Sequence, residues 1–303
     1  MRAFTVDEKG SLLAYLFKVL AGTKKTRIKQ FLKFKSVSVN GTISTRFDHP
    51  LGPGDRVSVA TAQSEKFKPS PAFGVEIVYE DDSLVVINKP AGLLTIATEK
   101  VQTRTAFYSV NEYLNRVEEK KLFKKGRPED RRPLRKKQIF IVHRLDQDTS
   151  GLLMFAKNEE IKHRLQDHWK KVRKKYWAVV EGTPGKNSGT VTSFLRQTQT
   201  LKVTSGPEQR GSKSAVTHYR VVRSGESHSL LEIDLETGRK HQIRVHLADL
   251  GHPVVGDEKY GNGTDPVGRL ALHAHSLAFP HPLSGEPMVF QSDLPPVLKG
   301  LVP

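Results

Sequence analysis

The sequence contains no cysteine among its 303 residues. This absence excludes disulfide bonds, zinc sites built on thiolates and catalysis by a cysteine nucleophile, and it fits a reducing compartment. No hydrophobic run approaches the roughly 18 residues that a membrane-spanning helix needs, and residues 1–10 lack the apolar stretch of a secretory signal peptide. We therefore expect a cytoplasmic protein that has no membrane partner.

Acidic residues are scarce relative to basic ones: 32 Asp and Glu stand against 49 Lys and Arg, a formal net charge of +17. A large positive charge favours a polyanionic partner, with nucleic acid as the first candidate. A generally basic, soluble surface without such a partner is the alternative. The excess is concentrated in two segments, residues 1–62 and residues 116–137, each with 11 basic against 4 acidic residues. The rest of the chain is close to balanced and has the composition of an ordinary globular domain.

The amino-terminal segment has the pattern of a small helical and β-hairpin domain. Apolar residues at helical spacing predict a helix over 11–21. A second helix is predicted over 27–35, with Thr26 as its amino-terminal cap. Asn40-Gly41 predicts a tight hairpin turn, and a further strand is expected after Gly54-Asp55.

This arrangement, over about residues 10–60, resembles the alpha-L RNA-binding domain of ribosomal proteins and RNA-modifying enzymes. The resemblance implies that basic residues on the outer face of the second helix contact RNA, namely Arg27, Lys29 and Lys33. A helix-and-hairpin domain with some other partner is the alternative.

The chain is expected to divide into a domain over 1–62, a linker over 63–73 and a second domain over 74–303. Apolar runs predict strands at 75–80, 84–89, 139–142, 152–156, 189–194, 200–204, 214–223 and 228–235, with another beginning near 176. Helices are expected at 105–118, 159–174 and 240–249. So many successive strands predict an α+β fold with a mixed, mainly antiparallel sheet. The basic insertion over about 119–138 is expected to protrude, either as a phosphate-binding loop or as a solvated insertion.

The second domain is organised around residues 139–158, which set Asp146 in a polar loop between two apolar runs. An ordinary turn in which Asp146 pairs with Arg144 is the plain interpretation. However, HRLDQDTSGLL at 143–153 resembles the signature of the RluA-type pseudouridine synthases, which isomerise uridine within RNA. In that family the aspartate at this position is catalytic, so the resemblance assigns catalysis to Asp146.

Other stretches of the chain match the same family. Lys89-Pro90-Ala91-Gly92 resembles its first motif, and Tyr176 stands in its Lys-x-Tyr context, where the tyrosine stacks on the target base. Residues 237–246, TGRKHQIRVH, and 256–261, GDEKYG, match two further patterns. In the family a basic residue of this region pairs with the catalytic aspartate; Arg244 is the first choice and Arg239 the second.

The resemblance also implies the reaction and its participants. Uracil is detached from the ribose, turned while held and rejoined through carbon 5 without a cofactor, with Asp146 as nucleophile at the anomeric carbon or as base at the ribose 2′ position. His143, Arg239 and Lys240 would contact the substrate, and Ile243 or Leu145 would exclude water. Independently of the resemblance, Arg144 stands two residues before Asp146 and is expected to project to the same side, where it would fill the gap left by an extruded nucleotide. A simple ion pair with Asp148 or Asp146 is the alternative. The expected partner is RNA, with ribosomal RNA as the first candidate and transfer RNA as the second, and the protein is expected to act as a monomer.

Three alternatives to a pseudouridine synthase are a metal centre, a metal-dependent nuclease and a non-catalytic RNA-binding protein. A metal centre would draw on His241, His246, His273 and His275, but the first two are five residues apart and would not share a helix face. A metal-dependent nuclease would need clustered carboxylates, whereas Asp148, Asp234 and Asp257 fall in different motifs. A non-catalytic RNA-binding protein that keeps the synthase fold is the remaining alternative to an enzyme.

Overall fold

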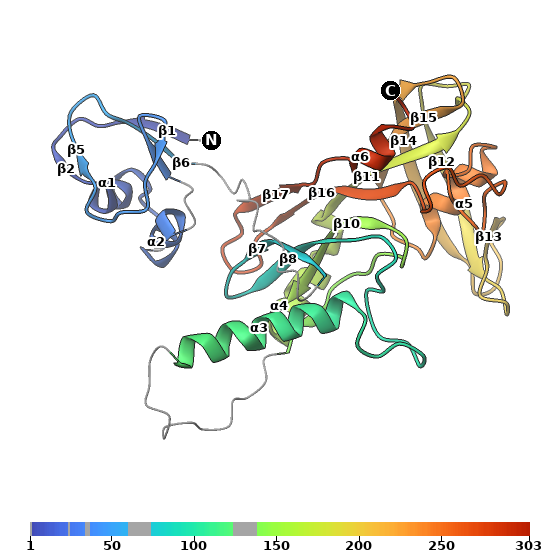
Figure 1. Cartoon of the computed structure of the whole chain (residues 1–303), viewed down its shortest axis with the longest axis horizontal. Helices are drawn as coiled ribbons and strands as arrows, with labels where there is room; N and C mark the ends of the chain where they lie inside the picture. The colour runs from blue at the N-terminus through green and yellow to red at the C-terminus, as the bar shows by residue number, and fades with distance from the viewer. Residues whose placement is uncertain (1, 24, 34–36, 60–73, 124–137) are drawn as a thin grey trace. The chain divides into compact units, whose positions relative to one another are not determined.

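The computed structural model describes residues 2–23, 25–33, 37–59, 74–123 and 138–303. The chain divides into two compact units, the first holding most of the residues before Lys66 and the second most of those after it. Figure 1 colours the first unit blue and the second from cyan to red. We describe each unit by itself.

The first unit packs two helices against short strands. Its elements are β1 (Arg2–Thr5), β2 (Gly10–Ser11), α1 (Leu12–Val19), α2 (Lys25–Lys33), β3 (Val37–Val39), β4 (Thr42–Ile43), β5 (Pro50–Leu51) and β6 (Arg56–Val59). The strands form a sheet in the order β1-β6-β3-β4 and a separate β2-β5 pair. Leu16 of α1 and Ile28 and Leu32 of α2 are buried in its core, as their helical spacing requires.

The structure confirms one local prediction for this unit and contradicts another. The predicted hairpin is confirmed, because β3 pairs with β4 and both Asn40 and Gly41 have positive φ angles, 51° and 83°, as tight hairpin turns require. The predicted cap at Thr26 is wrong, since α2 already begins at Lys25. Lys29 is exposed, whereas the side chains of Arg27 and Lys33 lie outside the described residues.

The second unit is built on one large sheet. Its strands are β7 (Glu76–Glu80), β8 (Leu84–Lys89), β9 (Phe140–Ile141), β10 (Ser150–Ala156), β11 (Arg173–Glu181), β12 (Ser188–Gln197), β13 (Val203–Gly206), β14 (Lys213–Ser224), β15 (His228–Leu235), β16 (Leu272–Pro280) and β17 (Pro287–Gln291). The main path runs β13-β12-β14-β15-β11-β16-β10-β8-β7, with β9 paired to β10 and β17 to β16. The β10–β16 pair is parallel and its neighbours are antiparallel, which confirms the predicted α+β fold and mixed sheet.

Helices cover separate parts of this sheet. They are α3 (Ala106–Phe123), α4 (Glu159–Asp167), the short 3-10 helix η2 (Trp169–Lys171), α5 (Gln242–Asp249) and α6 (Pro296–Lys299). In Figure 1, α3 and α4 lie beside the β7–β10 end, and α5 lies beside β13 and β14 at the other.

Three helix boundaries differ from the sequence prediction. The helix predicted over 159–174 ends at Asp167, and strand β11 already starts at Arg173. The helix predicted from Lys240 starts two residues later, because His241 adopts a left-handed backbone with φ 54°. Helix α3 runs to Phe123, and the rest of the predicted basic insertion, residues 124–137, lies outside the described residues.

Strands β10 and β16 approach each other closely at Gly151. This glycine has φ +110°, and a β-carbon placed on it would lie 2.2 Å from the carbonyl oxygen of Ala274. All seven residues of β10 are buried, so the strand crosses the middle of the core. The polar loop that contains Asp146 therefore leads directly into a strand whose position is tightly fixed.

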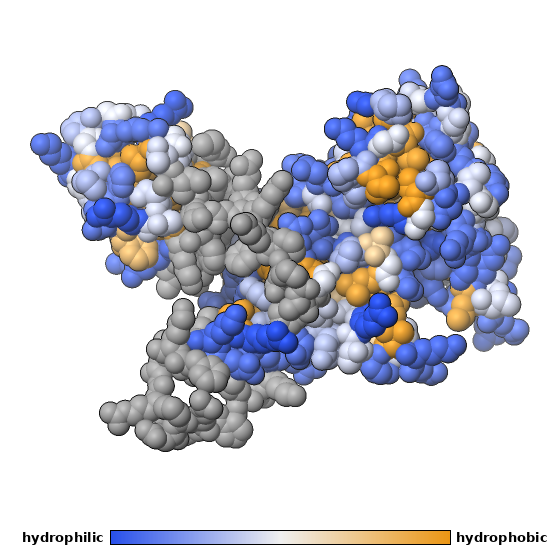
Figure 2. Space-filling view, viewed as in Figure 1, coloured by the Kyte–Doolittle hydropathy of each residue, from blue (hydrophilic) through white to orange (hydrophobic). Residues whose placement is uncertain are grey.

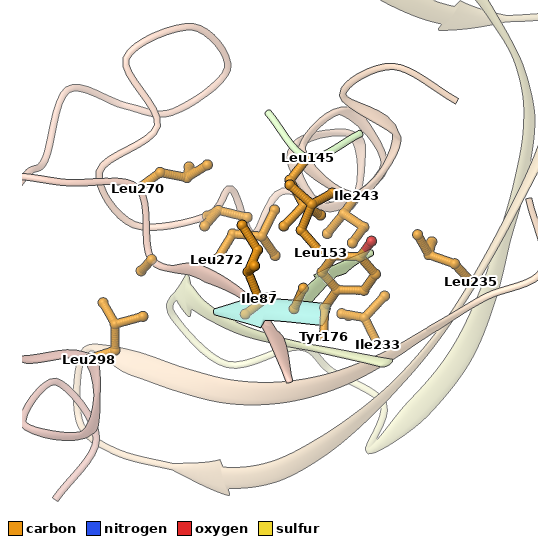
Figure 3. Packing of buried hydrophobic residues seen from close by; sticks show 14 of the residues in the cluster. Ile87, Leu145, Leu153, Tyr176, Ile233, Leu235, Ile243, Leu270, Leu272 and Leu298 are labelled. Carbon is orange, nitrogen blue, oxygen red and sulfur yellow. The ribbon is translucent and has the colours of Figure 1, made fainter. Parts of the chain in front are cut away.

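The main core lies under this loop. Figure 3 shows Tyr176 projecting from β11 among Leu153 and Ile233, with Leu145 and Ile243 on the side of its hydroxyl group. At the surface, the large unit is mostly hydrophilic in Figure 2, with an apolar patch over the region of β14 and α6, where Val222 and Val297 are exposed. Within the described part of the chain, no helix is long and apolar enough to cross a membrane.

Candidate active site

Asp146 lies in a cleft of about 1300 Å³ in the second unit. The walls are formed by some of the residues in four stretches of the chain, 91–98, 143–148, 235–244 and 256–270, together with Trp169, Lys174 and Tyr176. The side chain of Asp146 is 26% exposed, so its carboxylate is open to a molecule that enters the cleft.

The backbone of the loop is held by hydrogen bonds on both sides of Asp146. The hydroxyl of Thr95 donates to the carbonyl of Leu145 at 2.7 Å and accepts from the Leu145 N–H at 3.2 Å. The ammonium of Lys89 donates to the carbonyl of Gln147 at 2.7 Å. These contacts fix the carboxylate's position without using its oxygens, which remain available for chemistry.

Lys89 is fully buried, with 0% of its surface exposed. It also donates to the carbonyls of Pro90 and Leu93, at 3.0 and 2.7 Å. Burial lowers the pKa of Lys89 to about 7, against the opposing charges of Asp148 and Asp146. The sequence marked the Lys-Pro-Ala-Gly stretch as a motif, but the role of Lys89 as an anchor of the Asp146 loop was missed.

Arg244 joins two carboxylates. Its Nη1 atom lies 3.5 Å from Oδ2 of Asp146, while its Nε and Nη2 atoms donate to the two oxygens of Asp257, each at 2.7 Å. Asp257 has 0% of its side chain exposed and also accepts the backbone N–H groups of Lys259 and Tyr260. Asp257 thus holds the guanidinium in a bidentate pair and aims its third nitrogen at Asp146.

The charges of this pair reinforce each other. Burial would lower the pKa of Arg244, but hydrogen bonding and charge from Asp257, and then from Asp146, outweigh it and raise the pKa. Burial would likewise raise the pKa of Asp257, and Arg244 outweighs it, so the pKa of Asp257 is lowered. The pair is therefore ionised at neutral pH, and Arg244 presents a permanent positive charge to Asp146.

His241 approaches Asp146 from the residue before α5. Its Nε2 atom lies 3.9 Å from Oδ2 of Asp146, and its Nδ1 atom lies 2.8 Å from the hydroxyl of Tyr260, which accepts the N–H of Val203 at 2.9 Å. Burial lowers the pKa of His241, and Asp146 opposes this. Asp257, His241 and Tyr260 are members of the site that sequence reasoning did not assign, although all three stand in the motifs it identified.

Other predicted site residues lie along the same cleft. Tyr176 faces it from β11, and burial first, then the charge of Asp146, raises its pKa. Arg144 is exposed in the cleft wall, and among the described residues it makes no ion pair with Asp146 or Asp148, so the plain interpretation of an Arg144–Asp146 pair is wrong. Lys240 is exposed in the wall as well.

The remaining predicted residues are placed differently. Arg239 lines the cleft but donates to the carbonyl of Ser214 and not to Asp146. His143 also lines the cleft, and its Nε2 atom accepts the N–H of Met154 at 3.1 Å. Ile243 is buried in the core near Tyr176 and is not among the residues of the wall, whereas Leu145 is.

The histidines considered as metal ligands take part in hydrogen bonds. His246 bonds to Ser193 and Thr217, and His273 bonds to Ser150 and Ser292. Across the described ranges, no three histidine, aspartate or glutamate side chains gather in a group that could hold a metal ion.

Known proteins share this fold and sequence. A family model for RNA pseudouridylate synthases matches residues 83–249. The chain is 34% identical to the uncharacterized RNA pseudouridine synthase YhcT of Bacillus subtilis, covering 98% of this chain and 94% of that one. It is also 34% identical to ribosomal large subunit pseudouridine synthase D of Neisseria meningitidis, over 94% of this chain and 76% of that one. Human RNA pseudouridylate synthase domain containing 4 has a similar structure, with a TM-score of 0.57 and 26% identity over 74% of this chain and 90% of that one.

The chain therefore belongs to the RNA pseudouridylate synthase family, and the predicted resemblance to its RluA-type members is confirmed. It is an RNA pseudouridine synthase, an isomerase that acts on RNA.

Proposed function

We propose that this enzyme isomerises specific uridines in ribosomal RNA of the large subunit, with Asp146 as its catalytic residue. The RNA is inferred from relatives that are named ribosomal large subunit pseudouridine synthases. The observation that carries the proposal is the Asp146 carboxylate, partly exposed in a basic cleft and contacted by Arg244 at 3.5 Å. Transfer RNA is the second candidate substrate.

The reaction breaks the bond between N1 of uracil and C1′ of ribose and forms a bond between C5 and C1′. The hydrogen on C5 leaves as a proton, and N1 gains one, so the product is an isomer of the substrate. Asp146 takes part either by attacking C1′, which gives a covalent intermediate, or by removing the proton at C2′. Both routes need an ionised carboxylate close to the sugar, and the position of Asp146 in the cleft meets this need.

The neighbouring side chains then have defined tasks. Arg244, held by Asp257, orients the Asp146 carboxylate by charge pairing, and Tyr176 packs against the face of the detached base while it turns. Leu145 forms part of the apolar wall that excludes water from the sugar. Arg144 has no partner in the protein among the described residues, so its guanidinium is free to stack in the gap left by an extruded uridine.

Binding of the larger RNA is assigned to the basic surfaces. Arg239, Lys240 and His143 line the cleft, and we assign them contacts to the nucleotides near the uridine. In the first unit, which has the helices and hairpin expected of an alpha-L domain, we assign phosphate contacts to Arg27, Lys29 and Lys33 of α2. We expect the protein to act as a monomer in the cytoplasm and without a cofactor.

A non-catalytic RNA-binding protein with the same fold is the alternative. Such a protein has no use for a buried arginine–aspartate pair that directs a charge at an open carboxylate. The arrangement of Asp257, Arg244 and Asp146 therefore favours the enzyme.

Release of tritium from C5 of labelled uridine tests the proposal. Purified protein is incubated with transcripts of large-subunit ribosomal RNA and of transfer RNAs, with and without a chelator, and the modified uridine is then mapped. We expect release from a ribosomal transcript, unchanged by chelator and absent in Asp146→Asn. Release only from transfer RNA would refute the substrate, and full activity in Asp146→Asn would refute the catalytic residue.

A further inference from the structure

Lys174 is a nearly buried lysine whose ammonium group has no hydrogen-bond acceptor among the described residues. The residue is 7% exposed, and it lines the cleft that holds Asp146. Its stem is buried while its Nζ atom opens on the cleft, as is usual for a lysine whose charged head stays in contact with water. Burial lowers the pKa of Lys174, and the charge of Asp234 opposes this. Lys174 therefore has an unused capacity to bind an anion.

Two uncharged groups, Trp169 and Gly238, flank this ammonium. Its Nζ atom lies 5.2 Å from the centre of the Trp169 ring, and the Trp169 ring lies 5.2 Å from that of His143. His143 accepts a backbone N–H, and burial, followed by the charge of Lys174, lowers its pKa to about 3, so it is uncharged at neutral pH. Gly238 lies on another side, where a β-carbon would be 3.7 Å from Nζ. The Trp169 ring and the bare backbone of Gly238 thus flank the ammonium without neutralising it.

The position of Lys174 relates it to the nucleotide in the cleft. Lys174 and Tyr176 are two residues apart on β11, and both are buried on the same face of the strand. Such residues are separated by about 7 Å along a strand. If Tyr176 packs against the uracil, an anion at Lys174 lies about one sugar–phosphate unit from the base. In RNA, the anion at that distance is a phosphodiester group.

We propose that Lys174, framed by Trp169 and Gly238, binds a phosphodiester adjacent to the uridine that enters the cleft. The proposal rests on the proposed function and adds a binding subsite to it. Lysine binds phosphate as a compact point charge, so the contact fixes the backbone of the extruded nucleotide without reading its sequence. Exposed Arg239 and Lys240, which also line the cleft, add to the positive potential along the path of the backbone.

A combined change in protein and RNA tests this contact. The RNA is the fragment mapped in the tritium-release experiment, made with a neutral methylphosphonate at the phosphate before or after the modified uridine. Equilibrium affinity is measured for the full-length protein, for Lys174→Met and for the control Lys170→Met, which changes an exposed lysine of η2. We expect one of the two methylphosphonates to weaken binding by the native protein about tenfold, the usual size of a charged hydrogen bond.

Lys174→Met should weaken binding of unmodified RNA by a similar factor and show no further loss with that methylphosphonate. Lys170→Met should behave like the native protein, and Lys174→Arg should keep the sensitivity to the methylphosphonate. Losses that multiply when the two changes are combined would overturn the proposal, as would native affinity in Lys174→Met. Thermal unfolding of each variant shows whether it is folded. If Lys174→Met is not folded, the affinities of Lys174→Arg and of the native protein for the modified RNA decide whether Lys174 binds the phosphodiester.

These outcomes are separate from the proposed function. Loss of tritium release in Asp146→Asn with unchanged affinity upholds catalysis whatever Lys174 does. Conversely, the affinity measurements need no turnover.

Discussion

Arg244 contacts two aspartates that occupy opposite kinds of environment. Asp257 is completely buried, meets the guanidinium twice at 2.7 Å and accepts two backbone N–H groups. Asp146 is 26% exposed and meets the same guanidinium once, at 3.5 Å. A carboxylate whose hydrogen bonds are all satisfied stabilises the fold, and one whose oxygens are left open is available to a substrate. Other charged or titratable groups of the molecule are likewise either satisfied within the fold or open to a substrate. Each of the following predictions tests a group of one of these two kinds.

The largest effect is expected for the open carboxylate. Asp146→Asn should reduce the single-turnover rate of pseudouridine formation at least about 1000-fold, because an amide is neither nucleophile nor base. Its free energy of unfolding should change by less than about 1 kcal/mol, since a single long contact at a partly exposed site contributes little. RNA affinity within a few-fold of the native value serves as the control, and a rate close to native would remove Asp146 from the reaction.

The closed carboxylate should behave in the opposite way. Asp257→Asn should lower the free energy of unfolding by about 3 kcal/mol, because it leaves the buried Arg244 without its main counter-charge. The rate should fall by about 10- to 100-fold through the loss of a correctly oriented Arg244. Urea unfolding and single-turnover kinetics measure the two effects. If Asp257→Asn were as stable as the native protein, the distinction between the two aspartates would be lost.

Removal of the basic first unit tests exposed charges that do not belong to the catalytic unit. Deleting residues 1–62 should weaken RNA binding about tenfold or more and flatten its dependence on salt, since several phosphate contacts would go with it. Affinity measured across a series of salt concentrations gives the slope. An unchanged slope would mean that this unit, including the exposed Lys29, does not face the RNA.

Arg144 is exposed in the cleft wall, whereas Arg244 is buried and paired with Asp257. Arg144→Ala should reduce activity about tenfold more on a folded RNA than on a short unstructured strand with the same uridine, because extrusion from a stack costs a few kcal/mol. The rate ratio between the two substrates is the measurement, and Arg210→Ala, at an exposed arginine that does not line the cleft, is the matched control. Equal losses on both substrates would refute a role in extrusion.

The smallest effect is expected for His273, a buried histidine whose ring nitrogens are both hydrogen-bonded within the fold. Burial lowers the pKa of His273 from 6.5 to about 4, so the native state stays unprotonated between these values while the unfolded chain takes up a proton. The free energy of unfolding should therefore fall by about 1–2 kcal/mol for this group between pH 7 and pH 5, with half-buried His143 and buried His275 acting in the same direction.

His273→Asn should make the dependence on pH less steep, and the exposed control His163→Gln should leave it unchanged. Urea unfolding at a series of pH values gives the comparison. A slope as steep as that of the native protein would show that the pKa of His273 is the same in the folded and unfolded states.

The residues that sequence reasoning found are those within short continuous motifs. Asp146, Tyr176 and Arg244 each stand in such a stretch, and the periodicity of the flanking apolar residues placed them on the correct elements. Asp257 was named only as a possible metal ligand, because its partner lies 13 positions away across a loop. Lys174 was part of a motif, but its burial without an acceptor is a property of three-dimensional packing.

Boundaries failed where local geometry overrode periodicity. The left-handed backbone of His241 delays α5 by two residues, and no sequence pattern around a histidine requires that conformation. The parallel β10–β16 contact joins residues more than 100 positions apart, so it could not be inferred from neighbouring residues. The class of fold was predictable because the number and type of the strands leave few alternatives.

The close approach at Gly151 has a consequence for how such an enzyme changes over generations. Any side chain at this position would collide with Ala274, so mutation can reshape the walls of the cleft while the path by which the polypeptide leaves Asp146 stays the same. New RNA targets would then be acquired by altering the outer loops and the first unit. For a laboratory library, residues such as Arg144, Arg239 and Lys240 are the positions to randomise, and Gly151 is the one to hold constant.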